Sequence, residues 1–198
     1  HAYLVGGCVR DMILRKQPKD YDITTSATPD QVKEIFKGKF NIIDTGIKHG
    51  TVTLMVNYAL DDTDVYSVEV TTFRVDGKYT DNRHPDDIKF TNSLTEDLSR
   101  RDFTINAIAF NKQEGLIDPF YGLGDINSKI IKCVGNPNER FQEDALRMLR
   151  AVRFAAQLEF GIEKHTCQAI HGNHDLIKNV SIERVSEEIN KILRVNPL

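Results

Sequence analysis

Two short stretches near the amino terminus decide the fold: Gly6–Asp11, with the sequence GGCVRD, and Asp20–Thr25, with the sequence DYDITT. The apolar run Ala2–Val5 before the glycines predicts a strand, and Val9–Leu14 after them predicts a short helix. Asp20–Thr24 alternates polar with apolar residues, which is the period of a second strand. A strand, a glycine turn, a helix and a second strand indicate an α/β domain.

The segment that follows continues the alternation of helices and strands. Thr28 and Pro29 have the residue types of a helix start, and Gly38 is a typical helix end. Thr51–Val56 and Val65–Thr72 predict two further strands. The apolar stripe expected for the helix consists of Val32, Ile35 and Phe36.

Two stretches between these elements predict loops. Asp61–Asp64 is acidic and polar and predicts a solvated hairpin loop, and residues 57–66 form a longer hairpin tip than we expect. Residues 74–87 are polar, contain Gly77 and Pro85, and predict a long mobile loop of the kind that is often functional.

The carboxyl-terminal third has a helical pattern. From about Asn138 onward, apolar residues recur at 3.6 residues per turn, and Ile182–Leu193 repeats the pattern in a further helix. We therefore predict a catalytic α/β head over residues 1–137 and an all-α segment over residues 138–198. The apolar side of the first helix is expected to contain Phe141, Ala145, Met148, Leu149, Val152, Ala155 and Ala156.

Asp20 and Asp22 are candidate metal ligands. Residues two apart on a strand point to one face, so the two carboxylates are expected to project together. Such a pair repels unless it is compensated, and Mg²⁺ binds one or two carboxylates together with substrate phosphates. Glu69, between two valines of a predicted strand, is a candidate third carboxylate. The alternative is that these acids are ordinary solvent-facing strand residues.

The glycine turn is a candidate phosphate site. Glycines allow the backbone to approach a phosphate, and a helix amino terminus favours an anion. Gly7 lies in the turn, and Arg10 lies one helical turn further on, within reach of a triphosphate. Alternatively, Gly6 and Gly7 only form a tight turn, and Asp11 only pairs with Arg10 or Arg15.

The predicted helix after Asn138 carries a polar face with candidate base-reading groups. Asp144 and Arg147 are expected to be neighbours there, and an acceptor beside a donor fork matches the hydrogen-bonding edge of a base. Arg150 and Arg153 add positive charge for phosphates. The alternative is a solvated helix held by pairs such as Glu143–Arg147.

Composition excludes several protein classes. The chain has 198 residues, of which 40% are hydrophobic and 28% are charged, with a net charge of −3. No run approaches the roughly 20 apolar residues of a membrane span. Three dispersed cysteines predict a cytoplasmic protein without disulfide-linked partners. We expect the chain to be a fragment of a longer protein.

The motifs together resemble the class II CCA-adding enzymes, tRNA nucleotidyltransferases related to bacterial poly(A) polymerases. The resemblance covers nearly the whole chain, with six motifs in the order of the family. The matching segments are Leu4–Asp11, Asp20–Ala27, Glu69–Arg74, Arg100–Ala107, Asp118–Phe120 and Arg140–Arg147.

The resemblance implies a DNA-polymerase-β-like head with a mixed sheet, followed by an all-α neck. It implies that Gly7 and Arg10 hold the triphosphate and that Asp20 and Asp22 hold Mg²⁺ in a two-metal site, with Glu69 as a further catalytic carboxylate. The residues implied to contact the nucleotide elsewhere are Arg101, Asp102 at the ribose, Asp144 and Arg147 as the amino-acid template, and Arg150 and Arg153 in the pocket.

The function implied by the resemblance is addition of CCA to the 3′ end of tRNA from CTP and ATP. The tRNA would be held mostly by body and tail domains that are absent here. Residues 75–87 would be the flexible loop that helps the change from C to A addition. A poly(A) polymerase or A-adding enzyme is the alternative with the same chemistry, and a noncatalytic nucleotide- or RNA-binding module is the alternative from another class.

Overall fold

The computed structural model describes residues 1–44, 46–57, 65–79 and 85–195. The predicted loop Asp61–Asp64 and most of the 57–66 hairpin tip lie outside the described residues. The chain forms two compact units. Unit 1 comprises His1–Val75, Ile88–Arg100 and Asn106–Pro119, and unit 2 comprises Asp76–Asp87, Arg101–Ile105 and Phe120–Leu198. The head–neck boundary at residue 137 stays a prediction.

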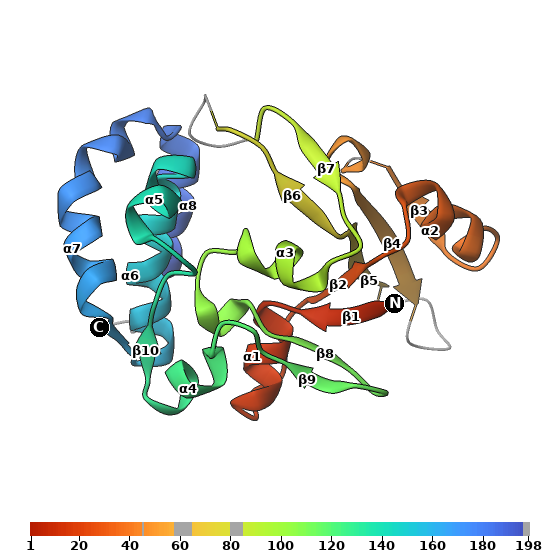
Figure 1. Ribbon diagram of the computed structural model, residues 1–198, viewed down its shortest axis with the longest axis horizontal. Coiled ribbons are helices and arrows are strands. Elements are labelled where there is room, and N and C mark those ends of the chain that lie inside the picture. Colours follow the sequence, from red (N-terminus) through yellow and green to blue (C-terminus); the bar gives the residue numbers. More distant parts are fainter. Residues whose placement is uncertain (45, 58–64, 80–84, 196–198) are drawn as a thin grey trace. The chain divides into compact units, whose positions relative to one another are not determined.

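Unit 1 contains a seven-stranded sheet in the order β3-β4-β5-β2-β1-β8-β9 (Figure 1). The pair β2–β5 is parallel and the other neighbouring pairs are antiparallel, which confirms the predicted mixed sheet. The strands are β1 (Ala2–Val5), β2 (Tyr21–Thr25), β3 (Asn41–Ile43), β4 (Thr51–Asn57), β5 (Val65–Thr72), β8 (Ala109–Asn111) and β9 (Gly115–Ile117).

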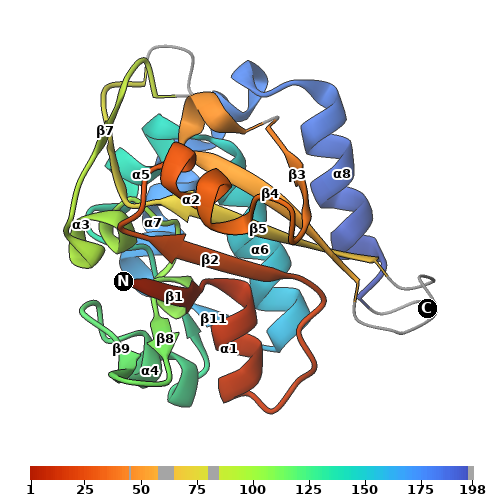
Figure 2. The ribbon, with the colours of Figure 1, turned by 90° about the vertical axis from the view of Figure 1, so that its right-hand side faces the viewer.

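Helix α2 (Pro29–Phe36) covers one face of this sheet (Figure 2). The Thr28 side chain accepts from the Gln31 amide and the Gln31 side chain accepts from the Thr28 amide, which confirms the predicted start. Val32 and Phe36 pack against the core of β4 and β5. Ile35 was predicted in the same stripe but is 54% exposed. The contact between α2 and the sheet includes Val32 and Phe36 and is too narrow to bury Ile35 as well.

A buried carboxylate joins helix α3 (Leu94–Ser99) to the opposite side of β2. Asp97 is fully buried and accepts from the Thr24 hydroxyl at 2.9 Å and from the Arg100 guanidinium at 2.9 and 3.0 Å. It also accepts from the Arg74 amide at 3.3 Å. A buried carboxylate is stable when its oxygens are satisfied in this way, and it ties three segments of unit 1 together.

The predicted loop at 74–87 begins with regular structure and is followed directly by a further strand. Arg74–Asp76 forms strand β6, which pairs with β7 (Ile88–Phe90). The ladder continues as Gly77 donates to the Asp87 carbonyl and Asp86 donates to the Lys78 carbonyl. The prediction of a loop was therefore wrong at Arg74–Asp76, since polar residues also fit a short exposed strand. Residues 80–84 lie outside the described part.

Unit 2 is mainly helical and packs around aromatic side chains. Phe103 and Phe154 meet edge-on at 5.8 Å, α6 packs against α8, and α5 packs against α7. In the part of the chain that is described, no helix is long and apolar enough to cross a membrane. The elements are α4 (Gly122–Asn127), β10 (Ile130–Ile131), α5 (Pro137–Glu143), α6 (Leu146–Leu158), β11 (Gly161–Ile162), α7 (Lys164–Asn173), η3 (His174–Asn179) and α8 (Ile182–Leu193).

Helix α8 begins and ends at the predicted residues, Ile182 and Leu193. The helix predicted from Asn138, in contrast, is divided into two. Asp144 has φ −146° and ψ 103°, an extended conformation that separates α5 from α6. The divided helix changes which residues are buried: Val152, predicted on the apolar side, is 40% exposed, while Arg153 is buried. Helix α7 continues through Gly172 and ends at Asn173.

Arg153 is buried because it pairs with a buried acid on α8. Its guanidinium donates to Glu188 at 3.1 Å, and the two side chains are 10% and 4% exposed. Lys191 donates to the same Glu188 oxygen at 3.3 Å, and the Arg153 guanidinium lies 4.4 Å from the centre of the Phe154 ring. This pair links α6 to α8 inside unit 2.

Thiol labelling tests the burial of the cysteines. All three are free; Cys8 and Cys133 are buried, and Cys167 is partly exposed. Burial raises the pKa of Cys133 to about 12 and also raises the pKa of Cys8. We expect iodoacetamide at pH 8 to modify Cys167 first and the other two only after unfolding, as read by mass spectrometry. Equal rates at all three cysteines in the folded protein would contradict this packing.

Urea unfolding tests the Arg153–Glu188 pair. Arg153→Met leaves the Glu188 carboxylate buried without its ion-pair partner on α6, so we expect a loss of about 3 kcal/mol in the free energy of unfolding. In the double variant Arg153→Met/Glu188→Met both charges of the pair are removed, and most of the loss should be recovered. A double variant as unstable as the single one would show that the side chains act by packing alone.

Candidate active site

Strand β2 places Asp22 next to Glu69 on one face of the unit 1 sheet. Asp22 is the register partner of Val5 on β1 and of Glu69 on β5. Register partners on neighbouring strands point to the same face, so the Asp22 and Glu69 side chains project together. Asp22 is half-buried and Glu69 is exposed. Ile23 points to the other face and packs on the core beneath α2.

Asp20 lies in a bend immediately before β2 and is exposed. The strand was predicted to begin at Asp20 but begins at Tyr21, because the bend before β2 has no strand pairing. Strand alternation therefore applies to Asp22 but not to Asp20. The projection of Asp20 beside Asp22 stays a prediction.

The three carboxylates supply hard oxygen donors, the ligand type of Mg²⁺. Among the described residues, no group of three or more His, Cys, Asp or Glu side chains is gathered closely enough to hold a metal ion. Mg²⁺, however, uses one or two carboxylates and completes its shell with water and substrate phosphates. The aligned Asp22 and Glu69 fit that mode of binding.

The glycine turn brings Arg10 beneath it. Gly6 has φ 80°, which requires glycine, and it caps α1 (Gly7–Ile13). A Cβ at Gly7 would lie 3.7 Å from the Arg10 guanidinium, so the Arg10 side chain folds back under the turn. The buried guanidinium donates to Asp11 at 2.8 and 2.9 Å and to Asn106 at 2.8 Å. The Arg10–Asp11 pair is confirmed, and phosphate binding by Arg10 stays a prediction.

In unit 2, Asp102 and Arg150 form a close ion pair. Arg150 donates to the Asp102 carboxylate at 2.6 and 2.9 Å, and the charge of Asp102 raises the pKa of Arg150. Asp102 is buried and also accepts from the Phe103 amide. Arg101, next to this pair, is partly buried. Asp102 and Arg150 were predicted as separate nucleotide contacts, and the structure joins them.

Asp144 and Arg147 have separate partners. Asp144 accepts from Arg184 on α8 at 2.9 and 3.3 Å and from the Leu146 amide at 3.1 Å. Arg147 pairs with Glu143 and donates to the Arg140 carbonyl. Burial lowers the pKa of Arg147, but the charge and hydrogen bond of Glu143 together with the charges of Asp102 and Tyr79 outweigh it, so the pKa is raised. The prediction that Asp144 and Arg147 are neighbours on one helical face is wrong, because the chain is extended at Asp144.

Residues 76–79 and 85–87 of the predicted flexible loop belong to the same unit, whereas Val75 belongs to unit 1. The Tyr79 hydroxyl donates to Asp76 at 2.8 Å. Burial raises the pKa of Tyr79, and the charges of Arg147 and Glu143 also act on it. Tyr79 therefore lies in the electrostatic environment of Arg147.

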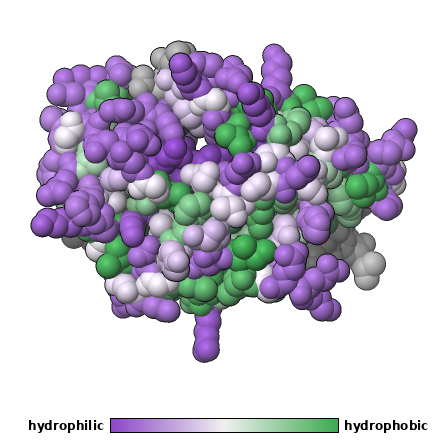
Figure 3. Space-filling view, in the orientation of Figure 1, coloured by the Kyte–Doolittle hydropathy of each residue, from purple (hydrophilic) through white to green (hydrophobic). Residues whose placement is uncertain are grey.

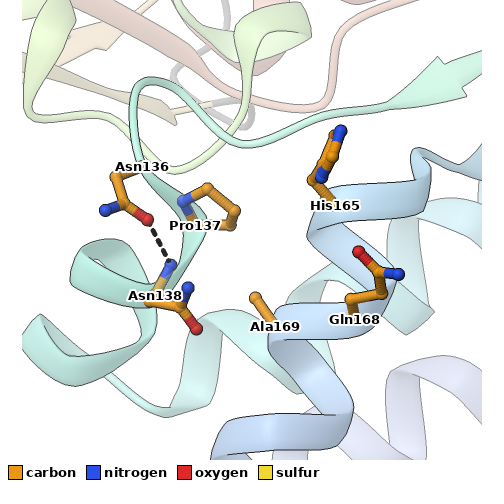
Figure 4. A pocket seen from close by; sticks show the side chains of 6 residues that line it. All are labelled: Asn136, Pro137, Asn138, His165, Gln168 and Ala169. Atoms are coloured by element: carbon orange, nitrogen blue, oxygen red, sulfur yellow. Dashed lines mark hydrogen bonds between the residues drawn. The ribbon is translucent and has the colours of Figure 1, made fainter.

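A cavity of about 360 Å³ lies elsewhere in unit 2, between the start of α5 and α7 (Figure 4). Its lining includes Asn136, Pro137, Asn138, His165, Gln168 and Ala169, none of which is a predicted site residue. Asn136 accepts from the Asn138 amide at 3.0 Å and so caps α5. The same helices present mostly hydrophilic side chains on the face seen in Figure 3.

Three partners of the site residues were not predicted: Asn106, Arg184 and Glu188. Each lies at least 35 residues from the side chain that it contacts. Periodicity and local motifs carry no signal at such separations. Two weaker signals were available in the sequence. Asn106 lies in the motif Arg100–Ala107, and the polar residues Arg184 and Glu188 lie one helical turn apart in the predicted helix Ile182–Leu193.

Comparison with known proteins agrees with this arrangement. Residues 2–132 match the poly A polymerase head domain, and residues 159–196 match the probable RNA and SrmB-binding site of polymerase A. The CCA-adding enzyme of Lactobacillus delbrueckii subsp. bulgaricus is 52% identical over 96% of this chain and 46% of its own length. That of Enterococcus faecalis is 49% identical over 97% of this chain and 45% of its own length.

Solved structures give the same result. The Bacillus stearothermophilus CCA-adding enzyme in complex with CTP has a TM-score of 0.84 and 45% identity, over 97% of this chain and 44% of that one. The Thermotoga maritima CCA-adding enzyme complexed with tRNA has a TM-score of 0.74 and 27% identity, over 97% and 42%. This chain thus spans less than half the length of these relatives. It belongs to the nucleotidyltransferase family of the poly A polymerase head domain and is similar within that family to CCA-adding enzymes.

Proposed function

We propose that this chain carries the transfer centre and the base-selecting residues of a CCA-adding enzyme, which adds C and A from CTP and ATP to the 3′ end of tRNA. The observation that carries the proposal is the register of β2 and β5, which projects Asp22 and Glu69 from one face of the sheet behind the Gly6–Gly7 turn. The identity of about half to CCA-adding enzymes supports the substrates.

In the proposed reaction the 3′-hydroxyl oxygen of the RNA bonds to the α-phosphorus of the nucleotide. The bond from the α-phosphorus to the bridging oxygen breaks, and pyrophosphate leaves with that electron pair. Asp20 and Asp22 would hold Mg²⁺, with Glu69 as a further carboxylate. When bound, the metal ions would lower the pKa of the attacking hydroxyl and neutralise charge on the leaving group.

The Gly6–Gly7 turn and Arg10 would hold the triphosphate. In the structure Arg10 is oriented by Asp11 and Asn106, so its guanidinium has a defined direction. A pre-oriented cation binds a phosphate without the entropy cost of ordering a long side chain. Arg101 and the Asp102–Arg150 pair would contact the sugar and phosphates.

Asp144 and Arg147 would select the base. Cytosine and adenine both present an exocyclic amino donor beside a ring nitrogen acceptor, which match a carboxylate acceptor and a guanidinium donor. Uracil and guanine present a carbonyl where cytosine and adenine present the amino group, and a carbonyl facing a carboxylate leaves two acceptors unpaired. Such a mismatch costs binding free energy and gives selectivity without a nucleic-acid template.

The cellular setting follows from the same proposal. Three free cysteines fit the reducing cytoplasm, where tRNA is processed. Regions outside this chain would supply most of the tRNA contacts, because the relatives are more than twice as long as the matched segment.

The catalytic assignment is tested by Asp22→Ala in the full-length gene product. We expect transfer of CMP to a tRNA lacking CCA to fall by roughly 10³-fold or more, because charge stabilisation worth several kcal/mol is lost. Asp30→Ala, which removes an exposed acid from α2 on the other face of the sheet, is the matched control and should retain activity. Retained turnover in Asp22→Ala would exclude the metal assignment.

The choice among family functions needs one extension assay. With a tRNA lacking CCA, a CCA-adding enzyme adds two C residues from CTP alone and completes CCA when ATP is also present. A poly(A) polymerase would extend with ATP alone into a long tract, and an A-adding enzyme would extend only a tRNA already ending in CC. No incorporation under any condition with Mg²⁺ would favour a noncatalytic module.

A further inference from the structure

Both carboxylate oxygens of Asp144 are already oriented by the protein. One oxygen accepts from the Leu146 amide at 3.1 Å and from Arg184 at 3.3 Å, and the other accepts from Arg184 at 2.9 Å. The Arg184 guanidinium thus contacts the carboxylate through two nitrogens, a geometry that fixes its plane as well as its position.

The extended backbone at Asp144 makes this orientation necessary. Asp144 lies between α5 and α6 with φ −146°, so no helical turn restricts its side chain. The Leu146 amide holds one oxygen, but a single hydrogen bond leaves the carboxylate free to rotate about it. The contact with Arg184, 40 residues away on α8, supplies the second constraint.

Arg184 is itself held in place. It lies on α8 one helical turn before Glu188, whose carboxylate pairs with Arg153 of α6 at 3.1 Å inside the protein. The side chains of Arg184 and Asp144 are only 22% and 16% exposed. Helix α8 therefore presents Arg184 from a rigid position, which is what the orientation of another side chain requires.

The neighbouring template residue does not serve this purpose. Arg147 pairs with Glu143 and donates to the Arg140 carbonyl, whereas among the described residues the donors to the Asp144 carboxylate are Arg184 and the Leu146 amide. A carboxylate has about four acceptor sites, and three donor groups contact Asp144. Capacity for one more donor remains.

We infer that Arg184 is a specificity-determining positioning residue, which orients the Asp144 carboxylate so that it accepts from the exocyclic amino group of cytosine or adenine. The inference rests on the proposed function. A carboxylate free to rotate would turn away from the carbonyl of uracil at little cost, so the rejection of UTP depends on the orientation that Arg184 imposes.

The test compares Arg184→Met with Arg184→Lys in the full-length gene product. The measurements are kcat and KM for CTP and for UTP on a tRNA lacking CCA, and the affinity of each nucleotide by calorimetry. For Arg184→Met we expect the preference for CTP over UTP to fall about 10- to 100-fold, as is typical when a residue that orients a functional group is removed. Arg184→Lys keeps the charge but loses the two-pronged contact, so it should restore little of the preference.

Arg194→Met is the matched control, because Arg194 is an exposed arginine that caps the end of the same helix. It should leave the preference for CTP unchanged. A purely structural role of Arg184 would lower kcat for both nucleotides equally and leave their ratio intact, and that result would overturn the inference. A folded Arg184→Met protein with an unchanged ratio would overturn it as well.

A second pair of variants separates this inference from the proposed function. Asp144→Asn should also lose the preference for CTP, and adding Arg184→Met to it should cause no further loss, because both act through one carboxylate. If Asp144→Asn loses the preference and Arg184→Met keeps it, only the role of Arg184 fails. If the unaltered protein shows no preference for CTP over UTP, the proposed function and the inference fail together.

Discussion

The pairing of β2 between β1 and β5 constrains the proposed transfer centre. β2 is hydrogen-bonded on both sides, antiparallel to β1 and parallel to β5. A slip of one residue against either neighbour would turn Asp22 into the core beneath α2 and bring Ile23 to the opposite face, which costs both a buried charge and an exposed apolar side chain. The Thr24 hydroxyl, bound to the buried Asp97, resists the same slip. The register therefore holds the acidic face with Asp22 and Glu69 together.

A second constraint acts in unit 2, where the chain departs from helical geometry at Asp144. The two short helices α5 and α6 take the place of one long helix. Two charged residues of α8 then form ion pairs with this region: Arg184 pairs with Asp144, and Glu188 pairs with Arg153. Buried ion pairs of this kind contribute little net stability, since desolvation offsets their attraction. Their effect is on geometry: each arginine is held by a specific acid, and each acid by a specific donor.

The predicted elements that were right depend on local chemistry. The strands Ala2–Val5 and Val65–Thr72 and the helix Ile182–Leu193 lie where periodicity placed them, and α2 begins at the predicted Thr28 cap. Two of the errors, in unit 2, have one physical origin. Periodicity reports which residues are apolar, but it does not report where the backbone leaves the helix or which charge is buried, so the break at Asp144 and the burial of Arg153 were missed.

The sequence by itself determined the mixed α/β fold, the glycine turn, the positions of the acids on β2 and β5, and the family, because each depends on neighbours within a few residues or on motifs in order. Only the tertiary structure decided the partners of the site residues: Asn106 for Arg10, Arg150 for Asp102, Arg184 for Asp144 and Glu188 for Arg153. These partners are 35 to 96 residues apart along the chain. Packing removes water from these charged side chains, and a buried charge is stable only when it is paired or hydrogen-bonded. The partner comes from whichever distant segment the fold places beside the charge.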